Sequence, residues 1–513
     1  MSAQTSLQIV GIPVELLVAI LTRLDYRDIL RCTAVCRYFS DVVRSSVQLQ
    51  YAIERGAEGM ADGLPTHDIS TAERLNCLLE RRDNWRQMKA KKVVSLSLDD
   101  NCLAYELVSG VLAIVGNKPG VYGNEGRSHL TASWLPSTSQ DERRVVFDDL
   151  GLVVKDFAMD PTQDLLALVE HRMDAMDNMI GDIQIHLRTL STNQRHERAK
   201  VPVLRHGIQQ SAVNSTMQIA DDVIGMFLSF PCAGIFIWNW TTGEMLVNAY
   251  HEAWLVHDFS FLSSRAYMLT IRNMEGCLEL FVFGENHFHV ASLSLPEIQQ
   301  DVILNLMRTH TGPFTAGAPP DAPFYVLPEY RVHVLTLLYI RPSPHRLVRM
   351  VIDHAALMSN ITEYFETKAH SPILKRWADW GPFATRALDY SHWRHWLRYV
   401  HGRRVVFPGQ ERTTVLDFGL DCIRNPSGPT LEDYTDPSGC PISISTDTVT
   451  EPTELPAGGH FKAPIITRLP FRIAEFSNTA SEHGIMIDDQ RLIGLTEDAE
   501  NNDELGEIRV LCY

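Results

Sequence analysis

The sequence lacks any apolar run long enough to span a membrane. No stretch reaches the roughly 18 apolar residues of a transmembrane helix, and the longest candidates, such as residues 332–340, have the length of a strand. The nine cysteines are odd in number and include no C-x-x-C pair, which favours reduced thiols over a disulfide framework. The apolar stretch at 12–21 contains Glu15 and follows no basic residue, unlike a secretory signal. We therefore expect a cytoplasmic and/or nuclear protein with no membrane partner.

Positive charge is also scarce. The 513 residues, enough for several domains, include 46 Lys and Arg against 63 Asp and Glu, which gives a formal net charge of −17. Duplex nucleic acids and anionic membranes attract proteins through a basic face. We therefore expect no nucleic-acid partner, although the composition leaves room for a local basic patch.

The usual sequence signatures of catalysis are missing. The chain contains no G-x-x-x-x-G-K-[ST], G-x-G-x-x-G, G-x-S-x-G or H-E-x-x-H motif. His251 and His257 are six residues apart, whereas two zinc ligands on one helix are separated by a single turn. Paired aspartates at 148–149, 221–222 and 488–489 adjoin strand-like sequence and fit turns. We predict that the chain is not an enzyme and has no cofactor and no metal site.

The most informative segment that is present is GIPVELLVAILTRL, at residues 11–24. At 100° per residue its polar residues Glu15, Thr22 and Arg23 share an arc of about 100°, so most of the helix surface is apolar. Asp25 is expected to cap a second helix. A module of about 40 residues cannot bury so much surface alone. The surplus must pack against the rest of the chain or against another protein.

Residues 12–43, IPVELLVAILTRLDYRDILRCTAVCRYFSDVV, resemble an F-box. The shared features are an Ile-Pro-Val-Glu start at 12–15, an Asp-Ile-Leu step at 28–30 and a Val-Cys-Arg step at 35–37 followed by aromatic residues. The sequence departs from the family pattern by Ile12 in place of Leu and by the lack of a Trp after the Val-Cys step. Both departures keep the apolar character of the pattern.

The resemblance implies binding to the Skp-type adaptor of cullin–RING ubiquitin ligases. The residues that it places in contact with the adaptor are Ile12, Pro13, Leu16, Ile20, Leu21, Leu24 and Leu30. Cys32, Val35 and Cys36 are predicted to form the internal core of the module.

Two further parts follow the F-box module of residues 1–50. Residues 51–90 predict a helical linker, in which Ser70 and Glu73 have the spacing of a capping box. Residues 91–513 predict a mainly-β domain of short apolar runs separated by turn residues. Two stretches in it, 309–328 and 424–464, are rich in Pro, Ser, Thr and Gly and are expected to be long surface loops.

An internal repeat suggests how the β-domain is built. Residues 154–170 and 256–272 align as Asp-Phe, a turn and an apolar strand, with a weaker copy at 217–230. Residues 235–246 resemble the third and fourth strands of a WD-type propeller blade, joined by a turn at Thr242-Gly243. We predict a β-propeller-like domain of about seven blades, closed by a last strand near the C-terminus.

One stretch stands apart from the acidic chain: HWRHWLRYVHGRR, at residues 392–404. It holds basic and aromatic residues and no acid, so it is either an amphipathic segment with its aromatic residues in the core or a recognition surface for an acidic or phosphorylated peptide. The second interpretation makes Arg394, Arg398 and Arg403 candidate client-binding residues. Replacing them by glutamate would then leave the fold intact and remove client binding.

The sequence therefore predicts a multidomain α+β protein with a small all-α F-box module, a helical linker and a mainly-β propeller-like domain. The predicted function is recruitment of an unknown client protein to a cullin–RING ubiquitin ligase through the Skp-type adaptor. Two alternatives stay open at this point: an enzyme with its active site in the channel of a propeller, and an F-box protein that acts outside the ligase.

Overall fold

A computed structural model of the chain describes most of its residues, namely 12–63, 69–98, 102–117, 127–173, 180–209, 215–229, 233–252, 255–319, 322–341, 343–389, 398–409, 411–419, 428–477, 482–497 and 505–513. Four helices form an N-terminal module: α1 (Val14–Leu21), α2 (Tyr26–Thr33), α3 (Arg37–Ser45) and α4 (Val47–Ala57). A longer helix, α5 (Thr71–Gln87), leads into the β-domain. Within the described residues no helix is long and apolar enough to cross a membrane.

Side-chain caps set the starts of these helices. Asp25 accepts a hydrogen bond from the Arg27 N–H and begins α2, as the sequence predicts. Ser70 and Glu73 form the predicted capping box at the start of α5. The buried residues of α1–α4 form a small core of their own, made of Leu17, Leu21, Ile29, Val42, Val43, Leu49 and Ile53.

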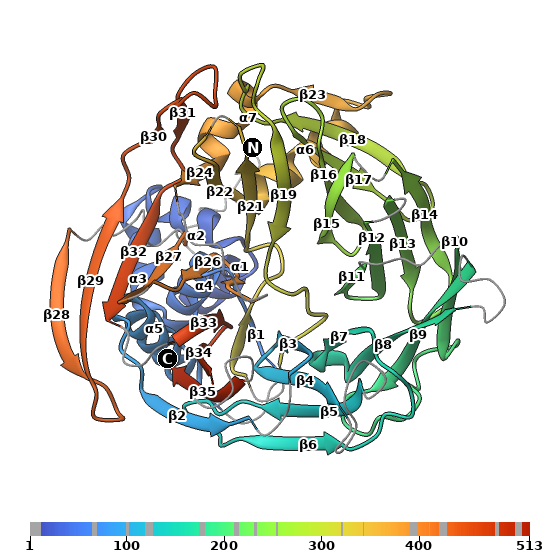
Figure 1. The fold of residues 1–513 in the computed structure, drawn as a ribbon. Helices are drawn as coiled ribbons and strands as arrows, with labels where there is room; N and C mark the ends of the chain where they lie inside the picture. Colours follow the sequence, from blue (N-terminus) through green and yellow to red (C-terminus); the bar gives the residue numbers. More distant parts are fainter. Residues whose placement is uncertain are drawn as a thin grey trace, which may run out of the picture.

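The β-domain is a seven-bladed propeller, which confirms the prediction (Figure 1). The first blade contains β3 (Ala104–Val108), β4 (Val111–Asn117), β5 (Arg127–Trp134) and β6 (Arg143–Phe147), and the second contains β7 (Asp156–Asp160), β8 (Leu165–Met173), β9 (Ile180–Thr189) and β10 (Val203–Gln209). The third blade contains β11 (Ser215–Ala220), β12 (Val223–Leu228), β13 (Ala233–Asn239) and β14 (Met245–His251), and the fourth contains β15 (Val256–Ser263), β16 (Ala266–Ile271), β17 (Cys277–Val282) and β18 (Phe288–Ser294). The fifth blade contains β19 (Leu304–His310), β21 (Val332–Tyr339), β22 (Arg346–Asp353) and β24 (Thr385–Leu388). The sixth contains β25 (Val400–His401), β26 (Arg404–Phe407), β27 (Arg412–Asp417) and β32 (Phe471–Ser477). The seventh contains β33 (Glu482–Ile487), β34 (Arg491–Glu497), β35 (Leu505–Cys512) and β2 (Lys92–Ser97).

The sequence repeat corresponds to the two innermost strands of a blade. Its copies form β7–β8, β15–β16 and, in the weaker copy, β11–β12. Residues 235–246 lie in the third and fourth strands, β13 and β14, as predicted. Gly243 has φ of +80° in the turn between these strands, and a Cβ there would lie 2.6 Å from Val201, so only glycine fits without strain.

The ring is closed by pairing a strand that precedes the first blade with the strand at the C-terminal end of the described residues. β2, directly after α5, pairs antiparallel with β35, with Lys92 opposite Cys512 and Ser97 opposite Glu507. The last blade therefore has three strands from the C-terminal end of the sequence and an outer strand from before the first blade. The predicted closing strand at the C-terminus is present, with β2 as its partner.

Two insertions decorate the propeller and were not predicted. Between β22 and β24 the chain forms α6 (His354–Glu366), β23 (Ile373–Lys375) and α7 (Trp377–Ala384), and β23 adds a parallel outer strand to the fourth blade. The stretch 424–464, expected to be a loop, contains β28 (Thr430–Thr435), β29 (Pro441–Val449) and β30 (Thr453–Leu455) in its described part. β28 and β29 widen the sixth blade, and β30 pairs with β31 (Ile465–Thr467).

The stretch 309–328 is also not a free loop. It carries β20 (Phe324–Val326), which pairs antiparallel with β1 (Met60–Asp62), the segment between α4 and α5. The hydroxyl of Tyr330 donates to the Ala57 carbonyl oxygen at 2.9 Å, and a Cβ on Gly59 would collide with the Tyr330 ring at 2.0 Å. The chain between the two domains is therefore part of a sheet, not a tether.

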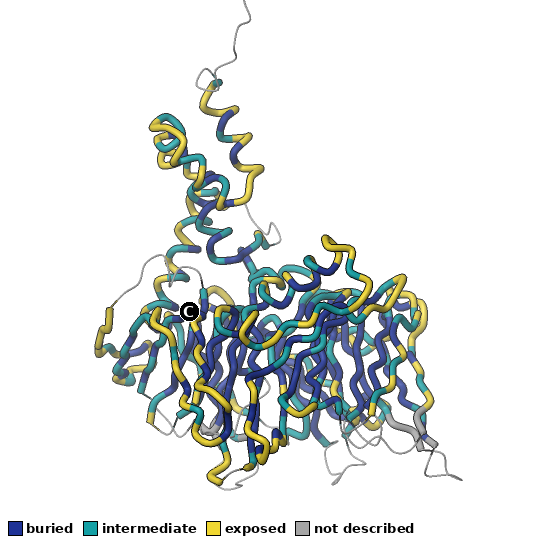
Figure 2. The backbone as a smooth tube through the Cα atoms, turned by 90° about the horizontal axis from the view of Figure 1, so that it is seen from above, coloured by how far each residue is buried: buried dark blue, intermediate teal, exposed yellow. Residues whose placement is uncertain are grey.

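Side chains of α5 also hold the N-terminal helical module against the propeller. The Trp85 indole stacks on the ring of Tyr513 with centroids 4.3 Å apart, and the Arg404 guanidinium lies 4.4 Å from the Trp85 ring. Arg81 forms an ion pair of 2.5 Å with Asp489 in the last blade. Figure 2 shows the result: the helices project from one face of the propeller disc.

Two buried histidines lie on this side of the propeller and predict a pH dependence of stability. Nε2 of His333 is 3.0 Å from Nδ1 of His354. Burial and the nearby Arg331 and Arg403 lower the pKa of His354 to about 3, and burial lowers the pKa of His333 well below its usual value. Unfolded imidazoles take up protons near a pKa of about 6.5, so their contribution to stability is present above that pH and is lost as the pH falls toward the folded pKa.

We expect the free energy of unfolding to fall by about 1.4 kcal/mol per pH unit for each such histidine between about pH 6 and pH 4. His354→Gln is expected to have a shallower slope. Urea titrations at several pH values measure it, and equal slopes for the two proteins would contradict the assignment.

Candidate functional site

The helical module presents an apolar face to solvent. On α1 and just after it, Val14, Leu16, Ile20 and Leu24 are 44, 58, 53 and 40% exposed. Their neighbours Leu17 and Leu21 fill the module core at 3% exposure each. The helix is therefore apolar on two sides, and only one of them is covered within the described chain.

The predicted adaptor contacts divide between surface and core. Pro13, Leu16, Ile20 and Leu24 are exposed, whereas Ile12 and Leu30 are half-buried. Leu21 is buried, so it stabilises the module and does not contribute to the exposed face.

The predicted internal core is wrong at two of its three positions. Val35 is 70% exposed and Cys36 is exposed, because they lie between α2 and α3, where Cys36 is the extended N-cap residue of α3. Cys32 is half-buried and packs against the module core. Val35 therefore adds a further exposed apolar side chain to the module.

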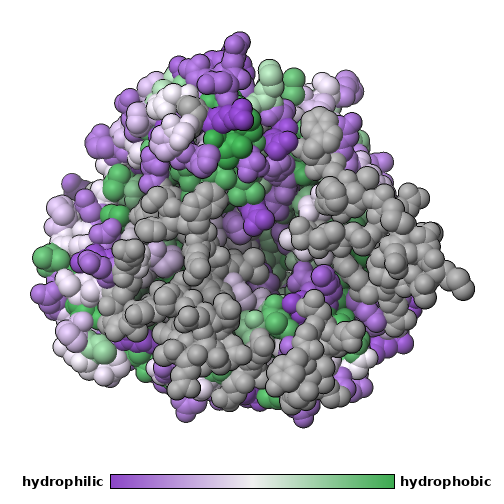
Figure 3. All heavy atoms as spheres, viewed as in Figure 1, coloured by the Kyte–Doolittle hydropathy of each residue, from purple (hydrophilic) through white to green (hydrophobic). Residues whose placement is uncertain are grey.

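The propeller has a central cavity of about 510 Å³. The side nearest the helices is covered by residues 311–319 and 322–331, whose Ala316 N–H donates to Asp160 Oδ2 at 3.2 Å. Arg331 holds this segment by donating to the carbonyl oxygens of Gly312 and Pro313 at 2.8 and 3.2 Å. Figure 3 shows a hollow at the centre of the opposite face. The cavity therefore faces away from the helical module.

Acidic groups from the innermost strands line this cavity. Asp156 and Asp258 each accept a hydrogen bond from the N–H of the following phenylalanine, at 2.8 and 2.9 Å. Burial raises the pKa of both carboxyl groups to about 6. Burial and nearby arginines lower the pKa of His310, also in the cavity wall, to about 4. Near neutral pH the cavity can thus offer two carboxylates and a neutral imidazole to a ligand.

The arginines of the basic stretch have structural partners. Arg398 forms two hydrogen bonds of 2.6 Å to the carboxylate of Glu106, across the cavity wall. Arg403 donates to the carbonyl oxygen of Phe418 at 2.7 Å and lies 3.3 Å from Asp353. Arg394 lies outside the described residues. Arg398 and Arg403 are thus engaged in contacts within the propeller, and the role of the three arginines in client binding stays a prediction.

The cavity residues were missed as a candidate site, although the sequence carried the signal. The Asp-Phe repeat, which predicts the blades, also places an acid at the same point of two innermost strands. No group of three or more His, Cys, Asp or Glu that could hold a metal ion occurs in the described part of the chain.

The structure thus joins a helical module with an exposed apolar face to one face of a seven-bladed propeller. Residues 9–51 match the F-box-like family, which confirms the resemblance found in the sequence. No curated protein sequence matches the chain.

Several solved structures match the chain at low similarity. They include a chain of a mitotic checkpoint complex (7% identity, 83% of this chain and 96% of that one, TM-score 0.34) and the C-terminal WD40 domain of Sif2 (9%, 83% and 98%, 0.31). An uncharacterised protein of Listeria monocytogenes EGD-e matches at 11% identity over 52% of this chain and 67% of that one, with a TM-score of 0.27.

Proposed function

We propose that this chain is a substrate receptor of a cullin–RING ubiquitin ligase. The F-box-like module would bind a Skp-type adaptor, and the propeller would hold a client protein. The observation that carries the proposal is the exposed apolar face of α1 within a segment that matches the F-box-like family. Four large apolar side chains in one short region are more than scattered surface residues explain.

The proposed positions of the adaptor and the client follow from how the helical module is attached to the propeller. The adaptor would lie on the side of the helices, because α1–α3 project there, away from the propeller (Figure 2). The client would use the other face, where the central cavity opens (Figure 3). The chain itself would perform no chemistry; it would raise the effective concentration of the client near the ubiquitin-carrying enzyme.

Co-expression with a Skp-type adaptor followed by size-exclusion chromatography tests the proposal. The wild type is expected to form a stoichiometric complex. Leu16→Asp/Ile20→Asp is expected to weaken it by about 100-fold or more, because two central apolar anchors are replaced by charges. Both positions are exposed, so the melting temperature of the chain alone should stay within about 1 °C.

Leu374→Asp is the matched control, since Leu374 is 78% exposed and lies on β23 of the propeller. It should bind the adaptor as the wild type does. A wild type that elutes alone, or a double variant that keeps the complex, would refute the docking proposal. An adaptor complex that excludes cullin would point to an F-box protein acting outside the ligase.

A further inference from the structure

The wall of the central cavity carries more negative than positive charge among its described residues. It contains three carboxylates, Glu106, Asp156 and Asp258, and two guanidinium groups, Arg308 and Arg398. Glu106 and Arg398 neutralise each other, because two hydrogen bonds of 2.6 Å join them. Two carboxylates therefore remain against the single guanidinium of the exposed Arg308.

Asp156 and Asp258 have no close cation of their own in the described part of the chain. Arg127 and Lys155 act on Asp156, and Arg308 acts on Asp258, but none of them forms an ion pair within 4.0 Å. Burial raises the pKa of both carboxyl groups more than these cations lower it. A carboxylate kept from water in this way is stabilised when a ligand brings a cation to it.

Unused hydrogen-bond acceptors in the same wall are a second, independent observation. Asp156 Oδ1 accepts the Phe157 N–H at 2.8 Å, and no described donor bonds to Oδ2. The Thr309 N–H donates to Asp258 Oδ2 at 2.8 Å, which places the Thr309 side chain beside that carboxylate. Thr309 lines the cavity at 7% exposure, and its buried hydroxyl has no hydrogen-bond partner among the described residues. Such groups usually mark the place of a ligand or a water.

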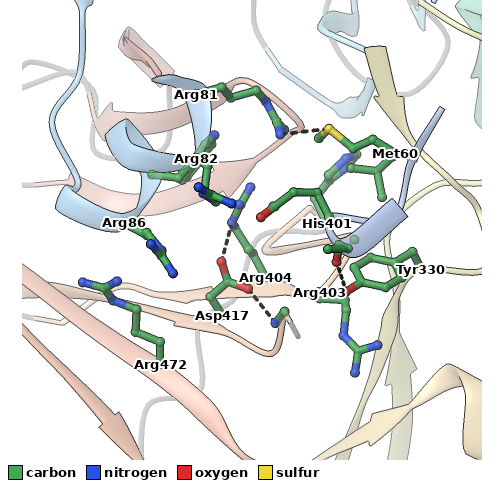
Figure 4. Close-up of a pocket in the computed structure, with 16 residues that line it drawn as sticks. Met60, Arg81, Arg82, Arg86, Tyr330, His401, Arg403, Arg404, Asp417 and Arg472 are labelled. Carbon is green, nitrogen blue, oxygen red and sulfur yellow. Dashed lines mark hydrogen bonds and ion pairs between the residues drawn. The ribbon is translucent and has the colours of Figure 1, made fainter. Parts of the chain in front are cut away.

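The small cavity between α5 and the sixth blade shows the opposite case, in which the chain pairs the charges itself (Figure 4). That cavity measures about 40 Å³. Its Asp417 pairs with Arg404 at 2.9 Å, and its Arg403 lies 3.3 Å from Asp353. The central cavity is larger, at about 510 Å³, and two of its carboxylates lack such partners.

We propose that the central cavity binds a basic side chain, arginine or lysine, of a client protein. Guanidinium and ammonium groups offer only N–H donors, which the carboxylates of Asp156 and Asp258 and the hydroxyl of Thr309 can accept. His257 and His310 of the same wall do not oppose a cation near neutral pH, because burial lowers the pKa of both imidazoles. The inference rests on the proposed function for the source of the cation and not for its chemistry.

The size of the cavity suits a side chain together with part of its backbone, since ligand pockets measure about 300–1,000 Å³. Such a client segment is the opposite of the acidic peptide considered for residues 392–404. The arginine of that stretch that lies in the cavity wall, Arg398, is already paired with Glu106.

Isothermal titration of the full chain with short capped peptides tests the proposal at constant ionic strength. The probes are Gly-Gly-Arg-Gly-Gly and Gly-Gly-Lys-Gly-Gly, and the uncharged control peptide has citrulline in place of arginine. We expect a Kd of about 1 mM or below for at least one basic peptide. The citrulline peptide should bind at least about tenfold more weakly, because charge-assisted hydrogen bonds are lost.

Substitutions in the wall locate the site. Asp156→Asn/Asp258→Asn should weaken binding of the basic peptides at least about tenfold, because asparagine keeps the side-chain oxygen but not the charge. Thr309→Val should weaken it about two- to tenfold without lowering the melting temperature, because its hydroxyl has no partner to lose. Asp141→Asn/Asp148→Asn is the matched control, since it removes the same charge from side chains that are 96 and 87% exposed. If the first double variant does not fold, Asp156→Asn alone replaces it.

Three results would overturn the proposal. One is equal affinity for the arginine and citrulline peptides, and another is equal affinity in the wild type and the cavity variants. The third is a phosphoserine peptide that binds more tightly than the basic peptides. Agmatine, a free guanidinium compound, distinguishes the sources of the cation. It should bind at least about tenfold more weakly than the arginine peptide, and equal or tighter binding would assign the cavity to a free small molecule instead of a client.

The adaptor experiment is independent of this one. Asp156→Asn/Asp258→Asn should still form the adaptor complex, and Leu16→Asp/Ile20→Asp should still bind the basic peptides. A wild type that binds the adaptor but no basic peptide would refute this inference alone. A wild type that binds basic peptides but no adaptor would refute the ligase function and leave the chemistry of the cavity standing.

Discussion

Arg398→Glu is expected to lower the free energy of unfolding by about 3–5 kcal/mol, because it leaves a buried carboxylate unpaired and adds a second one beside it. The Glu106 side chain is only 5% exposed and that of Arg398 16%. Glu106 Oε1 also accepts the Leu107 N–H at 2.8 Å, so it cannot turn away without losing that bond. The carbonyl oxygen of Arg398 accepts the Ile487 N–H at 2.8 Å. Arg398, just before the first strand of the sixth blade, thus contacts both the seventh blade and the first blade.

Urea unfolding of the full chain measures this effect. The control is Arg398→Met/Glu106→Leu, which removes both charges and should recover most of the loss, because a buried pair replaced by apolar residues is often nearly neutral. A single variant as stable as the wild type would show that Glu106 does not need this arginine. In that case Arg398 would be available to a client, as the basic stretch suggested.

Trp85→Ala is expected to loosen the helical module from the propeller while both domains stay folded. The substitution removes the stacking on Tyr513 and the contact with the Arg404 guanidinium, and a buried tryptophan replaced by alanine typically costs about 3–5 kcal/mol. We expect amide hydrogens of α5 to exchange about 150-fold faster, which corresponds to about 3 kcal/mol, the lower end of that range.

Hydrogen exchange read by mass spectrometry checks this prediction, with Trp85→Phe as the conservative variant that should retain most protection. Trp377→Ala is the control, since Trp377 lies on α7, and it should leave the exchange of α5 unchanged. Unchanged protection of α5 in Trp85→Ala would show that β1–β20 pairing and the Arg81–Asp489 ion pair suffice to hold the module.

The sequence predicts the module and the blades well because their local patterns are strong. These patterns lie within a few residues of the sequence. They are the capping aspartate before α2, the Ser70–Glu73 capping box of α5 and a first helix that is apolar around most of its circumference. The Asp-Phe repeat predicts the propeller blades for a related reason. Each copy begins an innermost strand, and the strand after it is buried on both faces by the neighbouring blades, so it reads as a continuous apolar run, as in β16.

Insertions were missed because they break the repeat without a motif of their own. The helix α6 does carry a helical spacing, with Leu357, Ile361 and Tyr364 buried, and Asp353 caps it, so that signal was available. In β29 the buried residues Ile442 and Ile444 alternate with half-exposed ones, yet the many Ser, Thr and Pro residues around them favoured a loop.

The candidate sites depend on contacts that no local pattern reports. Whether an arginine faces solvent or Glu106, 292 positions away in the chain, depends on how the ring closes. The same holds for the small cavity between α5 and the sixth blade, whose lining combines residues of α5 with residues of β25, β26 and β32. Sequence reasoning located the basic residues at 392–404 but not their partners.

The pairing of β2 with β35 also sets an order of events during synthesis. The helices emerge first, whereas the ring cannot close until its last strand has left the ribosome, about 400 residues later. At typical elongation rates this delay is about 20–80 s. The apolar residues of α1 have left the ribosome throughout that interval, so on the proposed function an adaptor could engage the nascent chain before the propeller is able to hold a client. Binding of the proposed adaptor would then precede closure of the propeller ring.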